Sequence, residues 1–207
     1  MFLRSVLFLM AAGVPQAATV VSVDGPVAHT ASFGTNQILT AGFTPGQDYS
    51  NVIISALING RVAETYTAYL TTAIGPLATV ADEVTSVTQN LPGPAALTPI
   101  FTGLDLSAGV TYYFTLFNPT GSGGWSSTEA PVTTEAPGSS HELSGYFIIV
   151  EPRPPGYPPS ADFTDLLEVS DRTFIYTVET AEVPEPGTFA LAASALGLLY
   201  LVRFVKR

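Results

Sequence analysis

Apolar and polar residues alternate over short stretches through most of the chain, which is the pattern of strands that bury one face. Runs rich in Val, Ile, Thr, Tyr and Phe occur at residues 52–58, 65–71, 110–117, 145–150 and 173–178. Turn-forming residues separate these runs, at 24–26, 44–46, 59–60, 75–76, 91–94, 107–109 and 118–119. Short strands with turn signals about every ten residues predict an all-β fold, an antiparallel β-sandwich or jelly roll.

Two local features refine this prediction. Asn59-Gly60 stands between two predicted strands, and this dipeptide favours a type I′ hairpin turn. The best helical window, residues 79–89, has Asp82 and Glu83 near its start but is rich in Thr and Val. β-Branched residues lower helix propensity, so a helix is not expected there.

Two stretches are predicted to be loops. Residues 118–140 are heavy in Gly, Ser, Thr and Pro and contain the only tryptophan, Trp125. Residues 151–160 hold five prolines in ten positions, which favours a solvated, polyproline-like connection. Long loops in compact domains are often functional, so 118–140 is a candidate binding segment.

The first 18 residues have the pattern of a signal peptide. Arg4 precedes the apolar run 6–12, and small residues stand at Ala17 and Ala18. The apolar run is too short for a membrane span, which takes about 20 residues. We therefore expect export through the Sec translocon, with signal peptidase cleaving after Ala18 or Ala17.

A second apolar segment, residues 188–202, lies near the other end and carries no charged residue. Its length corresponds to about 22 Å of helix, a marginal transmembrane span. Arg203, Lys206 and Arg207 follow it. Such charges act as a stop-transfer signal and place the C-terminus in the cytoplasm, with the body outside.

Charge is distributed unevenly over the 207 residues, of which only 12% are charged. All 17 acidic residues but only three basic ones lie within residues 19–187, giving this segment a formal charge of −14. A surface this acidic repels phosphate backbones and excludes nucleic acid as a partner. The absence of cysteine excludes disulfides, thiolate metal sites and cysteine nucleophiles.

Immediately before the second apolar segment stand Pro184, Glu185 and Pro186. Two prolines separated by one residue prevent both helix and sheet, so the tripeptide should be extended and accessible. The order of signal peptide, Pro-Glu-Pro, short transmembrane stretch and basic tail resembles that of PEP-CTERM proteins. The resemblance covers residues 183–207, and residues 19–182 are then the ectodomain.

This resemblance implies a destination. Proteins of the PEP-CTERM type are sorted by exosortase, a membrane-embedded cysteine protease or transpeptidase of Gram-negative bacteria that make exopolysaccharide. By this similarity, Pro184, Glu185 and Pro186 form the recognition element, and cleavage near them releases the body to the cell surface or the extracellular matrix of a biofilm. The motif is an address and implies no activity for the body.

Aromatic residues supply an alternative function. The segment 104–117 resembles a hairpin found in many secreted bacterial β-sandwich modules, including carbohydrate-binding ones. Tyr112 and Tyr113 in it, and Trp125 in the predicted loop, are candidates for stacking on sugar rings of an exopolysaccharide. The alternative is structural: the tyrosines pack against the sheet, and Trp125 folds back to cap one end of the sandwich.

No catalytic set can be assembled, so we expect no enzymatic activity. The two histidines, His29 and His141, lack metal-site spacing, and no nucleophile elbow, P-loop or dinucleotide fingerprint occurs. Glu142 beside His141 is the one suggestive local pair, although adjacent strand residues point to opposite faces. Facing carboxylates of a glycosidase remain a third hypothesis.

No cofactor or catalytic metal is expected. Structural Ca²⁺ is an alternative, held by loop carboxylates such as Asp82 and Glu83, or Asp162 and Asp165. Without an EF-hand or a DxD loop, solvated surface charge is the better interpretation of these acids. The sequence thus predicts an exported, non-enzymatic β-sandwich, with a carbohydrate-binding module as the alternative.

Overall fold

The computed structural model of the chain describes residues 17–35, 37–75, 78–148, 166–168 and 172–181. Within these residues the chain forms fourteen β-strands and one short 3₁₀ helix, Val80–Asp82. The compact body spans Ala18–Ala181. The described residues contain no helix long and apolar enough to cross a membrane.

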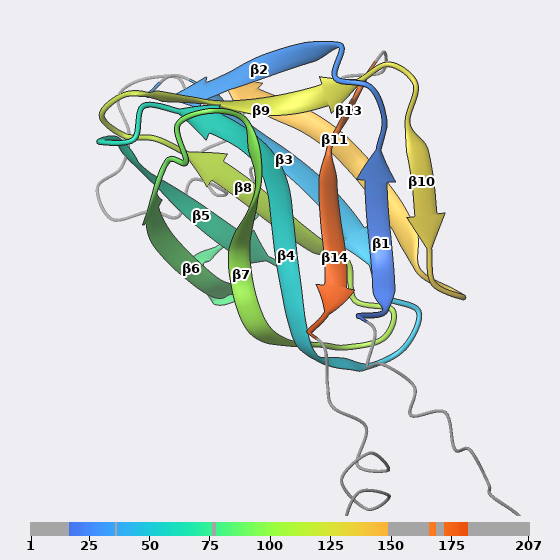
Figure 1. Cartoon of the computed structure of the whole chain (residues 1–207). Coiled ribbons are helices and arrows are strands. Elements are labelled where there is room, and N and C mark those ends of the chain that lie inside the picture. Colours follow the sequence, from blue (N-terminus) through green and yellow to red (C-terminus); the bar gives the residue numbers. More distant parts are fainter. Residues whose placement is uncertain (1–16, 36, 76–77, 149–165, 169–171, 182–207) are drawn as a thin grey trace, which may run out of the picture. The chain divides into compact units, whose positions relative to one another are not determined.

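The first sheet contains eight strands, and all its pairings are antiparallel. The main path runs β10 (Val132–Glu135), β1 (Thr19–Asp24), β14 (Tyr176–Thr180), β4 (Tyr49–Gly60), β9 (Ser122–Thr128) and β13 (Thr173–Phe174). Off this path, β2 (His29–Gly34) pairs with β9, and β7 (Ala96–Leu106) pairs with β4. Strands β4, β14, β1 and β10 form the front layer in Figure 1.

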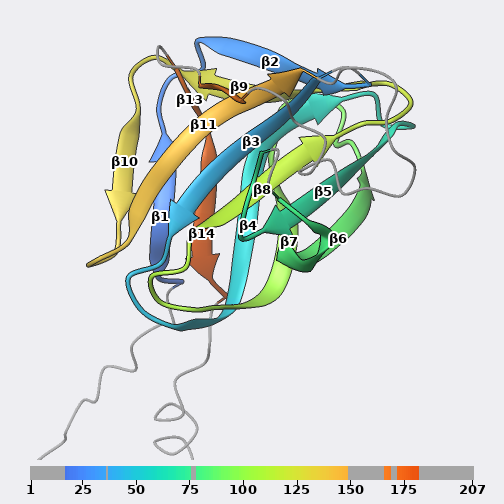
Figure 2. The same ribbon diagram turned by 180° about the vertical axis from the view of Figure 1, so that it is seen from behind.

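The second sheet contains six strands and is also antiparallel. Its order is β12 (Leu166–Glu168), β11 (Ser140–Ile148), β3 (Gln37–Thr44), β8 (Tyr112–Phe117), β5 (Thr65–Thr71) and β6 (Glu83–Asn90). Figure 2 shows these strands crossing obliquely in front of the first sheet. The predicted all-β fold is confirmed, and the two stacked sheets form a β-sandwich.

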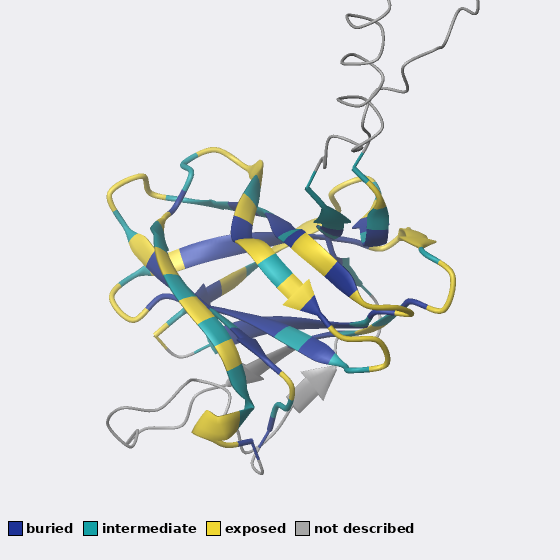
Figure 3. Ribbon diagram, turned by 90° about the horizontal axis from the view of Figure 1, so that it is seen from below, coloured by how far each residue is buried: buried dark blue, intermediate teal, exposed yellow. Residues whose placement is uncertain are grey.

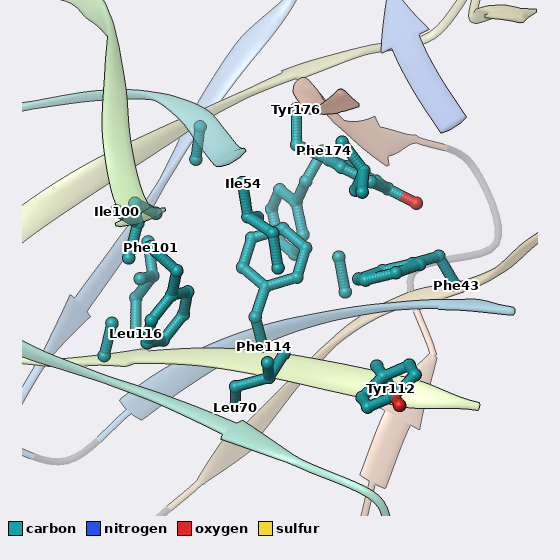
Figure 4. Packing of buried hydrophobic residues seen from close by; sticks show 14 of the residues in the cluster. Phe43, Ile54, Leu70, Ile100, Phe101, Tyr112, Phe114, Leu116, Phe174 and Tyr176 are labelled. Atoms are coloured by element: carbon teal, nitrogen blue, oxygen red, sulfur yellow. The ribbon is translucent and has the colours of Figure 1, made fainter. Parts of the chain in front are cut away.

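The core lies between the two sheets, and each sheet contributes alternate residues from its strands, as a sandwich requires. In the second sheet, Tyr112, Phe114 and Leu116 of β8 are at most 5% exposed and belong to this core. Figure 4 shows Phe114 reaching from this sheet toward Ile54 and Phe174 of the first. The buried positions concentrate in the strands, while most connecting loops are exposed (Figure 3).

The hairpin predicted at Asn59-Gly60 is wrong. Both residues continue β4, where Asn59 pairs with Gly124 and Gly60 with Gly123 of β9. The chain then crosses to the second sheet, because β5 pairs with β6 and β8 and not with β4. The turn signal therefore marks a crossing between sheets.

The predicted loop 118–140 is also wrong, because β9 and β10 lie within it. Residues 79–89, for which no helix was expected, contain the single 3₁₀ turn followed by β6, whose residues alternate between partly buried and exposed. The predicted signal peptide, the proline-rich stretch 151–160 and the C-terminal segment 183–207 lie outside the described residues, apart from Ala17 and Ala18.

Candidate functional site

Trp125 does not present its indole to a ligand. The side chain lies in β9, is fully buried, and stacks on Phe174 with ring centroids 4.6 Å apart and an interplanar angle of 17°. Phe114 packs against it from the second sheet at 4.9 Å. The candidate role of Trp125 in sugar stacking is therefore wrong, and the structural alternative is closer: the indole is a core residue between the sheets.

The two tyrosines have different environments. Tyr112 is 5% exposed and stacks on Phe43 with centroids 5.8 Å apart, and its hydroxyl accepts a hydrogen bond from the Ser107 N–H at 2.9 Å. Tyr113 is only partly buried and lies against Gly42, where an added Cβ would come within 2.9 Å of its ring. Stacking is thus wrong for Tyr112 as well, and Tyr113 alone of the three candidates keeps a partly accessible ring.

A polar groove lies on the first sheet instead. It has a volume of about 730 Å³ and is formed where β2, β4 and β9 meet the loops that follow β4, β6 and β8. Its lining consists of Thr30, Ser32, Asn59, Gly60, Arg61, Glu64, Gly93, Thr120, Gly121, Ser122, Gly123 and Gly124. No apolar side chain takes part, so the groove suits a polar ligand.

Strand register explains the floor of this groove. Ser32 of β2 pairs with Gly124 of β9, which pairs in turn with Asn59 of β4. The three residues therefore form one row across the sheet. An added Cβ on Gly124 would overlap with Oδ1 of Asn59 and with Cγ2 of Thr30. Glycine at this position gives the Asn59 amide the space in which it lies.

Hydrogen bonds fix the wall of the groove. Oε2 of Glu64 accepts from the Ser122 N–H at 3.2 Å and from the Asn118 amide at 3.5 Å, joining the loop after β4 to the loop after β8. Oδ1 of the buried Asn118 accepts from the N–H groups of Thr120 and Gly121 at 3.1 and 2.9 Å. These bonds give the loop after β8 a defined shape.

The groove carries one charge of each sign. Arg61 lies 3.8 Å from Oε1 of Glu64, and its side chain is 88% exposed while that of Glu64 is 24% exposed. A pair with this exposure and distance contributes little to stability. The guanidinium is therefore available to a ligand, and the groove is close to neutral overall.

His141 lies in a second polar cluster, where the two sheets meet. Its Nδ1 is 2.8 Å from the hydroxyl of Tyr176, which also donates to the Gly42 carbonyl at 3.3 Å. Burial lowers the pKa of His141, an effect opposed by Glu135 and Glu142. Burial raises the pKa of Tyr176, with the same two carboxylates adding to the rise.

Glu142 does not face the His141 ring as a catalytic partner would. Its Oε1 accepts hydrogen bonds from Ser140 at 2.6 Å and Thr44 at 2.7 Å, and these bonds lower its pKa. The pairing register with β3 shifts between His141 and Leu143, so Glu142 occupies a β-bulge. The cluster ties β11, β3 and β14 together, which is a structural role.

The described residues contain no group of three or more His, Asp or Glu side chains that could hold a metal ion. The carboxylate of Asp82 accepts hydrogen bonds from the N–H and hydroxyl of Thr79 at 2.7 and 2.9 Å, and Glu83 begins β6. Asp162 and Asp165 lie outside the described residues, as do Pro184, Glu185, Pro186, Arg203, Lys206 and Arg207.

Comparison with protein-family models found no match, and comparison with curated proteins found no similar sequence.

No groove residue was singled out for binding by the sequence, although five of them lie in the candidate segment 118–140. Their signal was the cluster Gly121, Ser122, Gly123 and Gly124 beside Trp125, which indicated a loop by composition. A strand is equally rich in glycine and serine where the side chain of a neighbouring strand lies across its surface. Only the pairing of β9 with β2 and β4 reveals this cause.

Proposed function

We propose that the chain is an exported, non-enzymatic surface or matrix protein whose β-sandwich is delivered by the two terminal segments and then separated from them. In this proposal signal peptidase removes the N-terminal segment. Exosortase recognises Pro184, Glu185 and Pro186, and residues 188–202 hold the chain in the inner membrane until it cleaves. The body then remains at the cell surface or in the extracellular matrix.

The arrangement of the body's own ends supports this proposal. The N-terminal strand β1 and the C-terminal strand β14 are neighbours in the first sheet, with Thr19 opposite Glu179. Thr180 N–H donates to the Ala18 carbonyl at 2.9 Å, and Ala18 N–H donates to the Thr180 hydroxyl at 3.0 Å. Every described strand lies within Ala18–Ala181, so removal of both flanking segments leaves each of them intact.

Sorting is tested by cell fractionation. The full chain with an epitope tag inside the exposed β9–β10 turn is expressed in an exosortase-producing host and in the same host lacking exosortase. We expect a shorter, surface or extracellular product only where exosortase is present. Pro184→Ala with Pro186→Ala should abolish the shortening, while the matched pair Pro158→Ala and Pro159→Ala should not. Identical size and location in both hosts refute the proposal.

The mature N-terminus tests the signal-peptide part separately. Because Ala18 makes three hydrogen bonds with Thr180, we expect cleavage after Ala17, so that these bonds are retained. N-terminal sequencing of the secreted product should begin at Ala18. A product that still begins at Met1 contradicts export by a cleaved signal.

A further inference from the structure

We propose that the groove between β2, β9 and β4 is a binding site for a neutral saccharide chain, held by hydrogen bonds and not by aromatic stacking. This inference goes beyond sorting and does not depend on it. It also differs in position from the aromatic residues that the sequence suggested, of which Trp125 and Tyr112 are buried.

The polar side chains of the groove have unused hydrogen-bonding capacity. In the described part of the chain, no protein group forms a hydrogen bond with the side chains of Thr30, Ser32, Asn59 or Ser122. Hydroxyl and carboxamide groups both donate and accept hydrogen bonds. Sugar hydroxyls do the same, so a row of such groups matches a polyhydroxylated ligand.

The shape of the groove also suits such a ligand. Ser32, Gly124 and Asn59 lie side by side on three adjacent strands, which spreads the outer two about 10 Å apart. The central position has no side chain of its own, and the Asn59 amide lies over it beside the Thr30 methyl group, so a ligand in the groove would lie on this amide. The volume of about 730 Å³ is within the range of sites for small ligands.

The charges of the groove favour a neutral ligand. The lining has one cation, Arg61, and one anion, Glu64. An anionic sugar or phosphate would meet the carboxylate of Glu64 and a body with far more acidic than basic residues. An apolar ligand would find no apolar side chain among the lining residues. A neutral, hydroxyl-rich ligand avoids both the repulsion from Glu64 and the mismatch with a polar lining, and Arg61 can donate hydrogen bonds to its hydroxyls.

Backbone hydrogen bonds preorganise the groove. The Glu64 N–H donates to the Arg61 carbonyl, and the Gly60 N–H donates to the Gly93 carbonyl, each at 2.9 Å. Together with the bond from Ser122 N–H to Glu64, these fix the backbone around the groove. A wall that is already ordered loses little entropy on binding, which lets a hydrogen-bonded ligand bind measurably.

The test uses the full chain in detergent micelles on an array of neutral oligosaccharides (cellohexaose, mannohexaose, xylohexaose and a galactan fragment) and acidic ones (alginate and galacturonan oligomers). We expect binding to at least one neutral probe, with weaker or no binding to the acidic probes. Calorimetry with the best neutral probe then compares the wild type with a double variant that carries both Asn59→Ala and Ser32→Ala. The double variant should bind at least tenfold more weakly.

Matched controls lie on the other sheet. Asn90→Ala with Ser86→Ala removes the same two residue types from exposed positions of β6 and should change affinity less than twofold. Ser32→Tyr, at an exposed position, should fill the groove and abolish binding with an unchanged far-ultraviolet circular dichroism spectrum. No binding to any neutral probe, a preference for the acidic probes, or unchanged affinity in Ser32→Tyr overturns the proposal, while leaving the sorting proposal unaffected.

Discussion

The indole Nε1–H of Trp125 donates a hydrogen bond to the backbone carbonyl of Ile175 at 2.9 Å. The same carbonyl accepts from the Leu57 N–H at 3.1 Å, and the Ile175 N–H donates to the Ser126 carbonyl at 3.0 Å. Ile175 lies between β13, which pairs with β9, and β14, which pairs with β4. Trp125 therefore holds Ile175 in place at the point where the chain passes from β13, which pairs with β9, to β14, which pairs with β4.

Trp125→Phe should reduce the free energy of unfolding by about 1–3 kcal/mol, through the lost hydrogen bond and the smaller volume of the phenyl ring at a fully buried position. Trp125→Ala should cost about 3–5 kcal/mol, since it also leaves a cavity in the core. Urea unfolding followed by circular dichroism measures both. Tyr113→Phe, on the partly accessible outer face, serves as the control and should stay within about 0.5 kcal/mol of wild type. A Trp125→Ala variant as stable as wild type contradicts the assignment of Trp125 to the core.

Substitution of Thr177 should not destabilise the protein, because its Oγ1 is buried and has no hydrogen-bond partner in the described part of the structure. Thr177→Val removes a hydroxyl that is desolvated without compensation, so stability should stay equal or rise by about 1 kcal/mol. Thr71→Val is the matched variant, because the buried Thr71 hydroxyl donates to the Ala73 carbonyl at 2.8 Å. It should lose about 1 kcal/mol in the same urea titration. Equal losses in the two variants would mean that Thr177 has a partner.

Acidification should lower the stability of the fold over a pH range set by the pKa of His141. Burial lowers the pKa of His141 in the folded protein below its usual value of 6.5, so the unfolded chain takes up this proton more readily. Stability from this residue is therefore complete above pH 6.5 and is lost as the pH falls through the folded pKa. Melting temperatures measured from pH 7.5 to 5 should decrease, and less so in His141→Gln.

Glu142 titrates in a separate, lower window. Hydrogen bonds from Ser140 and Thr44 lower its pKa below 4.5, so its contribution is present above pH 4.5 and is lost on further acidification. A decrease between pH 7.5 and 5 that is identical in wild type and His141→Gln would show that His141 does not cause it.

The sequence predicted the strands well because each depends on local alternation. The predicted runs 65–71 and 110–117 contain β5 and β8, whose inward residues supply the core of the second sheet. The antiparallel sandwich followed from the spacing of these runs and of the turns between them. Neither inference needed knowledge of which strand pairs with which.

Pairing decided the features that the sequence did not predict. Asn59-Gly60 has the composition of a tight hairpin, but its partners in β9 come from more than 60 residues later in the chain. Trp125 among glycines and serines resembles a loop residue, yet Phe33, Asn59 and Thr30 fill the space beside those glycines. The composition shows that the glycine positions have no side chain, and only the tertiary contacts show which neighbouring side chains occupy that space.

Two adjacent glycines of β9 separate the stability of the core from the geometry of the groove. A Cβ on Gly123 would overlap with the ring of Phe33, which is fully buried. Gly123→Ala should therefore cost about 1–3 kcal/mol in urea unfolding, as overpacking does. A Cβ on Gly124 would instead displace the Asn59 amide and the Thr30 methyl group, both of which can move toward solvent. Gly124→Ala should cost less than about 1 kcal/mol and yet weaken saccharide binding, because Asn59 no longer lies in the row. If Gly124→Ala destabilises the protein as much as Gly123→Ala does, Gly124 is part of the core packing and the assignment of the groove floor is wrong.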